Sequence, residues 1–349
     1  MNNPDNTPPL KIKSRTLNWL LTNLFNTWYN SLLTILCLCV IFVFGRNFLF
    51  WVFNQAQWTV ISTNLRLFLI GRYPAELTWR IWTILAIIIA ISILTLGVLT
   101  KRFLTQLNSW LPLIWALSFP IVMWLIGGGF GLKPVGSDLW TGLLLTLILA
   151  IISIVLSFPL GILLALGRQS DLPIVRIFSI IYIEFIRGLP LIGILFMAQV
   201  MLPLFLPSDV RLDRVVRAIA GLTLFSAAYM AENVRGGLQA IPRGQKEAAK
   251  ALGFNPVLIT SLIVLPQALR VAIPSIVGQF IGLFKDTSLL AIFALLELTG
   301  IARSILAQPE FLGKYAEVYL FVGAIYWVFC YSMSLASRRL EKQLDIRQK

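Results

Sequence analysis

Eight long apolar runs constrain this chain more than any other feature. A helix that crosses about 30 Å of hydrocarbon needs roughly 20 mostly apolar residues. Windows of that kind lie near 28–45, 79–99, 110–127, 138–166, 178–206, 216–234, 259–297 and 316–337. The chain is 58% hydrophobic and 13% charged, whereas soluble domains are about 25% charged. Lipid must therefore contact much of the surface, and we predict an all-α integral membrane protein with about eight transmembrane helices.

The fifth and seventh runs are too long for one simple crossing, so each is expected to contain a break. Pro190 and Pro203 fall in the fifth run. Pro266, Pro274 and the charged pair Lys285-Asp286 fall in the seventh. A proline in a membrane helix can expose backbone groups to a cavity, although an ordinary tolerated kink explains each proline equally well.

The net charge of +14 is carried by basic residues between the apolar runs. A soluble domain this basic would suggest nucleic acid, but here Lys and Arg are typical of membrane loops, so we expect no nucleic-acid partner. Loops on the side of the two termini carry more Lys and Arg than loops on the other side. The positive-inside rule then places both termini in the cytoplasm.

The segments on either side of the last five predicted spans, 135–340, form separate regions. Residues 1–27 are predicted to be a cytoplasmic tail with an interfacial amphipathic helix, or else an early start of the first span. Residues 28–130 are an N-terminal extension with about three spans and a long external linker, 46–78, of unknown role. A glycine run at 127–131 marks its end, and residues 341–349 form a second cytoplasmic tail.

The loop after the sixth run has strong local signals. Residues 243–252 are good helix formers, and Gly253 stands where a helix end favours a left-handed residue. Asn255-Pro256 supplies an N-cap and a first-turn proline for a second helix. The sequence therefore predicts two short helices at an angle, a stiff projecting element held between membrane spans.

The same loop resembles the E-A-A signature of permease subunits of ATP-binding-cassette (ABC) importers. The matching positions are Glu247, Ala248, Ala249, Gly253, Ile263, Leu265 and Pro266. Segments 183–191, 228–237 and 284–289 are similar to the polar amino-acid branch, the histidine and glutamine permeases. The extension resembles that of larger permeases for general L-amino-acid uptake. The resemblance implies a five-helix permease core over 135–340 in a bacterial inner membrane.

The resemblance implies a transporter subunit and not an enzyme. No G-x-x-x-x-G-K-[ST] phosphate loop is present, so ATP and Mg would bind a separate ATPase, in two copies, and this chain would hold no cofactor. The other implied partners are a second permease subunit, either a related chain or an identical copy, a periplasmic amino-acid-binding protein and membrane lipid. Which polar amino acids are carried stays open.

Charges in or beside the spans favour transport independently, because a charge at the bilayer centre costs about 2.5–3.5 kcal/mol on insertion scales. The candidates for the substrate path or a gate are Glu184, Arg187, Glu232, Lys285, Asp286 and Ser288. Mixed signs suit a zwitterionic amino acid, but the same groups could instead pair with each other and fix helix packing.

Two other classes of protein would explain part of this sequence. An ion-coupled carrier would explain the spans and charges but not the E-A-A loop. A membrane enzyme acting on lipid-linked substrates is disfavoured because the chain has no His and no acidic metal cluster. We therefore predict no catalytic residue and no metal site.

Overall fold

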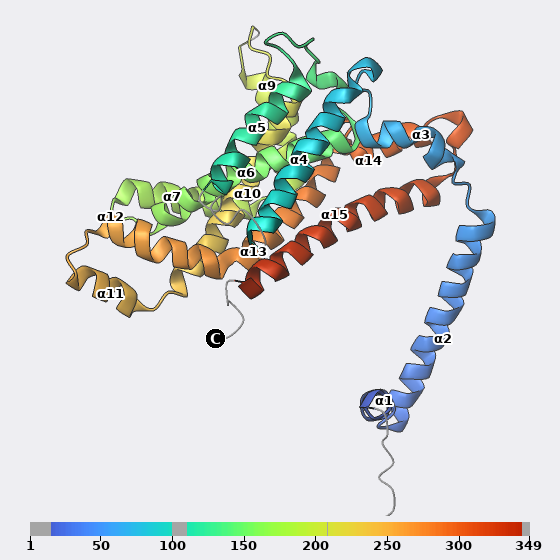
Figure 1. Cartoon of the computed structure of the whole chain (residues 1–349), viewed down its shortest axis with the longest axis horizontal. Helices are drawn as coiled ribbons and strands as arrows, with labels where there is room; N and C mark the ends of the chain where they lie inside the picture. The colour runs from blue at the N-terminus through green and yellow to red at the C-terminus, as the bar shows by residue number, and fades with distance from the viewer. Residues whose placement is uncertain (1–14, 100–109, 208, 344–349) are drawn as a thin grey trace, which may run out of the picture. The chain divides into compact units, whose positions relative to one another are not determined.

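In the computed structural model, the described residues are 15–99, 110–207 and 209–343, and over these ranges the chain is helical and forms no β-sheet. The longer helices are α1 (Arg15–Leu24), α2 (Trp28–Phe50), α3 (Thr59–Ile70), α4 (Thr78–Leu99), α5 (Leu111–Gly127), α6 (Gly142–Arg168), α7 (Pro173–Gly188), α10 (Arg214–Gln239), α11 (Arg243–Ala251), α13 (Leu265–Asp286), α14 (Leu298–Leu306) and α15 (Tyr315–Gln343) (Figure 1). Three short helices are α8 (Leu191–Phe196), α9 (Leu202–Phe205) and α12 (Pro256–Leu258). The predicted all-α membrane class is confirmed.

The apolar runs correspond to helices, although not all reach full length. Among the described residues, six helices are long and apolar enough to cross a membrane, and the pair of α7 with α8–α9, bent by 103°, adds a seventh if it is counted as one span. The break falls at Pro190, as predicted, whereas Pro274 lies inside the continuous helix α13. The third predicted run is α5, which has only 17 residues.

The chain divides into two compact units, 1–58 and 59–349. In the first, α1 ends at Leu24 and α2 begins at Trp28, whose N-cap is Thr27, so the two helices are separate. The predicted tail residues 1–14 lie outside the described residues, as do 344–349 of the second tail. Helix α2 has no buried side chain, which suits a helix surrounded by lipid or by another subunit.

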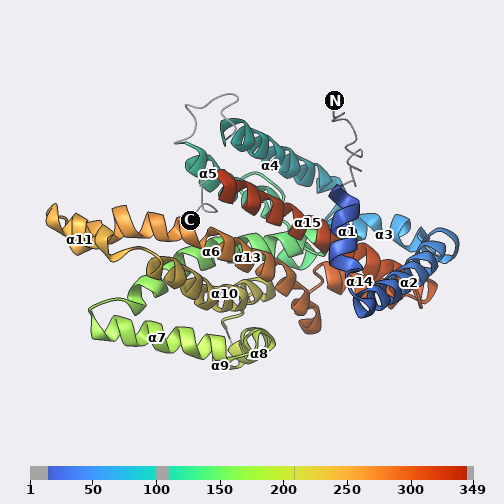
Figure 2. The ribbon, with the colours of Figure 1, turned by 90° about the horizontal axis from the view of Figure 1, so that it is seen from below.

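The centre of the second unit is the pair α6 and α10. Figures 1 and 2 show α10 between α7 and α13, and it also contacts α6 along its length. A Cβ at Gly161 of α6 would lie 2.5 Å from the Met230 side chain of α10. Helices in lipid associate through close van der Waals packing, and small residues permit it, so this glycine lets α6 and α10 approach closely.

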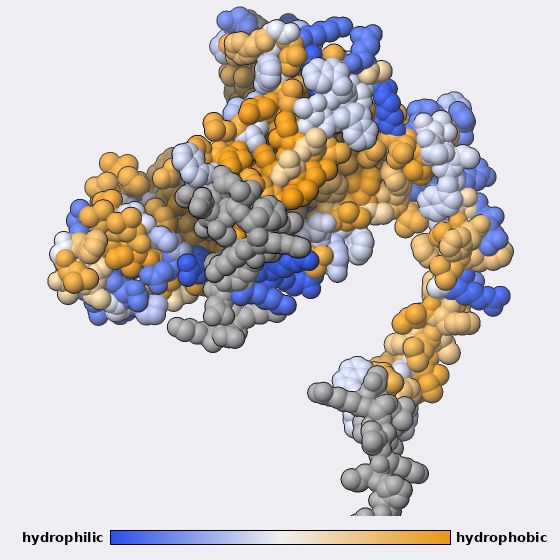
Figure 3. All heavy atoms as spheres, in the orientation of Figure 1, coloured by the Kyte–Doolittle hydropathy of each residue, from blue (hydrophilic) through white to orange (hydrophobic). Residues whose placement is uncertain are grey.

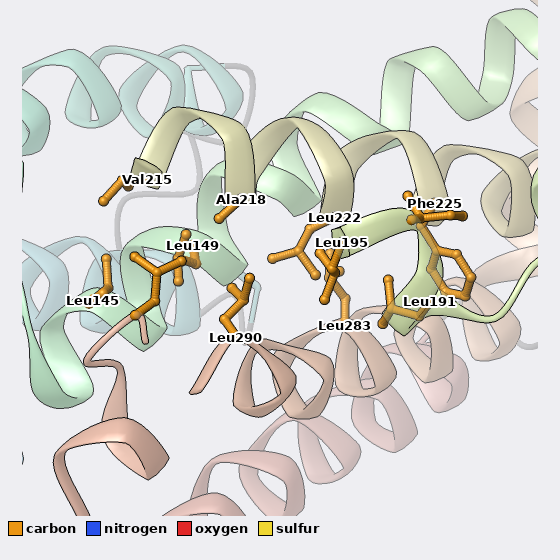
Figure 4. Packing of buried hydrophobic residues seen from close by; sticks show 12 residues of the cluster. Leu145, Leu149, Leu191, Leu195, Val215, Ala218, Leu222, Phe225, Leu283 and Leu290 are labelled. Carbon is orange, nitrogen blue, oxygen red and sulfur yellow. The ribbon is translucent and has the colours of Figure 1, made fainter. Parts of the chain in front are cut away.

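Leucine side chains fill the space between these helices at one end of the pair. Leu145 and Leu149 of α6 meet Leu222 of α10 and Leu283 of α13 in one buried cluster, joined by Leu195 of α8 (Figure 4). The outer surface is also apolar: Figure 3 shows hydrophobic residues across the bundle and hydrophilic ones gathered towards its edges. This pattern is expected of helices that face lipid on the outside and each other within.

The segment predicted as a linker, 46–78, is largely helical. Residues up to Phe50 continue α2, a π-helical turn covers Trp51–Gln55, and α3 follows. Val60 and Phe68 of α3 are buried against α14 and α15, which explains the order. This contact is made with residues more than 200 positions away, so the local sequence does not reveal it.

Candidate functional site

The loop between α10 and α13 has the predicted first helix and turn, but the predicted second short helix is the start of one continuous helical segment, Pro256–Phe293. Helix α11 ends in a Schellman turn, because the Phe254 N–H donates to the Ala249 carbonyl at 3.2 Å and the Gly253 N–H to the Lys250 carbonyl at 3.0 Å. Gly253 is left-handed, with φ +80°. The Asn255 side chain then accepts from the Leu258 N–H at 2.9 Å and caps α12.

The predicted coupling residues are divided between the surface of this loop and its base. Glu247, Ala248 and Gly253 are exposed, and so is Pro266. Ala249 is buried among side chains of α10, the π-helical turn Ile259–Val264 and α13. Ile263 and Leu265 are half-buried in the same cluster. The buried half fixes the loop to the membrane helices, while the exposed half is free to contact another protein.

The exposed face of the loop also carries apolar side chains that the sequence reading missed. Leu252 is 77% exposed, Val257 74% and Leu262 62%. Apolar side chains in a segment expected to project from the membrane are the sequence signal that could have identified them. Together with Glu247 they form a mixed surface suited to a protein partner.

A five-residue ion-pair cluster joins the ends of α6, α7 and α10. The Glu232 carboxylate lies 2.7 Å from Arg235, 3.0 Å from Arg168 and 3.3 Å from Arg187. Arg168 also contacts Glu184 at 2.8 Å. The structure thus brings together three of the predicted charges, Glu184, Arg187 and Glu232, and adds two arginines that were not among the predicted site residues.

Glu232 is the centre of this cluster. Its side chain is 14% exposed, whereas the other four are 25–55% exposed. Arg187 also lies over the ring of Tyr229, 5.7 Å from its centroid. Arg235 pairs with Glu232 within α10, whereas Arg168 of α6 and Arg187 of α7 reach it from the neighbouring helices. Separating the ends of these helices therefore requires breaking charge-assisted contacts.

The remaining predicted charges lie elsewhere. Lys285 is exposed at the end of α13, and Asp286 and Ser288 beside it are half-buried. Neither Lys285 nor Asp286 forms an ion pair with a described residue. The Asn233 amide of α10 donates to the Ser275 carbonyl of α13, and Lys285 is ten residues further along α13, about 15 Å at 1.5 Å per residue. The structure therefore separates these residues from the Glu232 cluster.

Comparison with known proteins places this architecture in a family. Residues 157–346 match the family described as "Binding-protein-dependent transport system inner membrane component". That range includes the ion-pair cluster and the whole loop. It begins inside α6, so the first five helices lie outside it.

Individual relatives extend the similarity. The inner membrane amino-acid ABC transporter permease protein YhdY of Escherichia coli (strain K12) is 41% identical over 95% of this chain and 94% of its own length. The glutamate/glutamine/aspartate/asparagine transport system permease protein BztC of Rhodobacter capsulatus is 50% identical over 61% of this chain and 49% of its own length. A crystal structure of an amino acid ABC transporter with histidines is 28% identical, with a TM-score of 0.53, over 58% of this chain and 92% of its own.

Proposed function

Because the chain belongs to the family of binding-protein-dependent transport system inner membrane components, we propose that it is the permease subunit of an ABC importer for polar L-amino acids. The names of its relatives support this substrate class, since YhdY is an amino-acid permease and BztC a permease for acidic amino acids and their amides. The observation that carries the proposal is the rigid projecting loop between α10 and α13.

The loop is the contact surface for the ATPase subunit. The exposed residues Glu247, Leu252 and Val257 dock on a separate ATPase that binds ATP and Mg. Ala249 and the Schellman turn keep the loop stiff, so a displacement imposed by the ATPase passes into α10 and α13 rather than being absorbed by a flexible hinge. Two ATPase copies would drive two permease subunits, the second an identical or a related chain.

The Glu232 cluster is placed to act as the inner gate. Arg235 lies eight residues before Arg243, where α11 begins, and Glu232 lies one turn before Arg235, so movement of the loop acts directly on the cluster. With both termini in the cytoplasm, the cluster faces that side. A periplasmic binding protein then delivers the amino acid to the opposite face, and ATP-driven motion of the loop opens and closes the path between them.

The test is uptake of a panel of labelled polar amino acids by cells with and without this chain. We expect uptake that stops on ATP depletion and survives collapse of the ion gradients at fixed ATP. Uptake driven by an ion gradient alone would instead indicate a secondary carrier. Unchanged uptake across the whole panel in cells lacking the chain would count against this substrate class.

A pair of glycine variants tests the loop itself. A Cβ at Gly253 or Gly244 meets nothing within 4 Å, but only Gly253 has positive φ, which costs a residue with a side chain roughly 1–2 kcal/mol. Gly253→Val should abolish uptake and co-purification of the ATPase while the protein still inserts. Gly244→Val is the matched control and should retain both. Equal uptake by the two variants would contradict the coupling role.

A further inference from the structure

A small cavity at the far end of α6 and α10 has the chemistry of an amino-acid site. It measures about 260 Å³ and lies at the N-terminal ends of both helices, beside the turn before α14. Helix α6 has 27 residues, so at 1.5 Å per residue its two ends are about 40 Å apart. The cavity is therefore remote from the Glu232 cluster, which lies at the other end of the same helices.

The charges that line the cavity are balanced in number and sign. Two arginines, Arg72 and Arg214, and two aspartates, Asp138 and Asp213, line it. Such a lining has no net charge, which disfavours a simple anion or cation. It is complementary to a solute that carries both signs.

Two of these four charges are already satisfied by the protein. Asp213 accepts from the Ser137 hydroxyl at 2.5 Å and from the Val215 N–H at 2.7 Å, as the N-cap of α10. The Arg214 guanidinium donates to the Phe293 carbonyl. These hydrogen bonds hold Asp213 and Arg214 in place in the cavity wall.

The other two charges have no ion-pair partner among the described residues. The side chains of Arg72 and Asp138 are both exposed, and they are of opposite sign. Trp140 also lines the cavity, with its indole N–H buried beneath the surface.

The frame around these groups is rigid. The Arg72 backbone N–H donates to the Thr141 hydroxyl at 2.7 Å, and the Gly142 N–H donates to the Leu296 carbonyl at 2.7 Å. Gly71 is held with φ +59° against Thr141, where a Cβ would lie 1.9 Å from its hydroxyl oxygen. The cavity is thus assembled from segments near residues 72, 140, 214 and 295, and its first half lies outside the range matched by the family, 157–346.

We propose that this cavity binds the α-amino and α-carboxylate groups of an amino acid, with Arg72 on the carboxylate and Asp138 on the ammonium group. This inference rests on the proposed function, under which the cavity opens to the external face. It assigns a role to the N-terminal extension: it completes a site at which an incoming amino acid first meets the permease. Recognition of the backbone groups makes the site tolerant of different side chains.

The test is equilibrium binding of L-glutamine to the purified permease–ATPase complex in nanodiscs without binding protein. We expect binding that weakens about tenfold or more in Arg72→Gln and in Asp138→Asn, since each removes a charged hydrogen-bond partner. Two derivatives should bind the unchanged protein more weakly than L-glutamine does, by a similar factor. They are N-acetyl-L-glutamine, which lacks the ammonium group, and L-glutamine methyl ester, which lacks the carboxylate.

Two exposed residues of the same region that lie outside the cavity provide controls. Lys133→Gln and Glu76→Gln remove one charge of each sign and should bind L-glutamine like the unchanged complex. Absence of binding, binding of either derivative as tightly as L-glutamine, or unchanged binding of L-glutamine by either cavity variant would overturn the inference. Uptake by cells is measured separately, so a working importer without this site is distinguished from a chain that does not import amino acids.

Discussion

Two adjacent glycines in α10 should respond in opposite directions to the same substitution. A Cβ at Gly236 meets nothing within 4 Å, whereas a Cβ at Gly237 would lie 2.3 Å from the carbonyl oxygen of Ala268 and 3.1 Å from the Ala272 Cβ, both in α13. The first position is open and the second holds α10 against α13. Alanine at each position therefore separates helix propensity from packing.

These distances set the expected change in the free energy of unfolding for each variant. In a helix, alanine is favoured over glycine by roughly 0.5–1 kcal/mol, so Gly236→Ala should stabilise the protein by about that amount. Gly237→Ala has the same gain, but its Cβ displaces a backbone carbonyl, and overpacking costs about 1–3 kcal/mol. Since backbone cannot move aside as the tip of a side chain can, we expect a net loss of about 1–2 kcal/mol.

The assay is thermal unfolding of both purified variants in the same detergent, together with ATP-driven uptake in proteoliposomes. Gly236→Ala should unfold at or above the temperature of the unchanged protein and retain uptake. Gly237→Ala should unfold at least a few degrees lower and lose uptake, because the α10–α13 contact adjoins the loop. Equal stability of Gly237→Ala and Gly236→Ala would refute the packing role of Gly237.

Two further predictions concern buried carboxylates. Glu232→Gln should destabilise the protein by about 2–4 kcal/mol, because hydrogen bonds to charged groups contribute roughly 1.5–3 kcal/mol each before partial exposure is discounted. Glu184→Gln, at a side chain that is 55% exposed, should cost less than about 1 kcal/mol. Chemical denaturation of both variants checks this order, and an equal loss of stability in the two would contradict it. Burial raises the pKa of Glu297 from 4.5 to about 7, so the folded protein holds a proton that the unfolded chain has released. The stability that Glu297 contributes is then fully present below about pH 4.5 and falls as the pH rises towards 7. Glu297→Gln should make the unfolding temperature less dependent on pH over that window, whereas Glu310→Gln should not. Identical plots of unfolding temperature against pH for the two variants would exclude Glu297 as the source of the pH dependence.

Local chemistry made the loop predictable. A helix end, a left-handed glycine and an Asn-Pro start are each decided by neighbours in sequence, and all three appear at Ala251, Gly253 and Asn255–Pro256. The apolar runs were predictable for a similar reason, because lipid imposes one length on every crossing. The sequence alone does not distinguish Pro190, where the helix breaks, from Pro274, where it continues, because the surrounding packing decides whether a proline ends a helix.

The ion-pair cluster shows where sequence reasoning stops. Glu184, Arg187 and Glu232 stood out because charges are rare in apolar runs. Arg168 did not, because it lies at a helix end where a basic residue is expected as a topogenic charge. Its contact with Glu232 joins residues 64 positions apart, and only the packing of α6 on α10 brings them together.

The same packing bears on how the two ends of the molecule communicate. Helices α6 and α10 both run from the cavity at Asp138 to the cluster at Glu232, and Gly161 holds them in contact between those ends. Closely packed interfaces have few alternative arrangements and do not deform continuously. A displacement of the C-terminal end of α10 is therefore shared by α6, so Arg168 and Arg235 stay with Glu232, and the contact that can open as the pair moves is the one between Glu232 and Arg187 of α7.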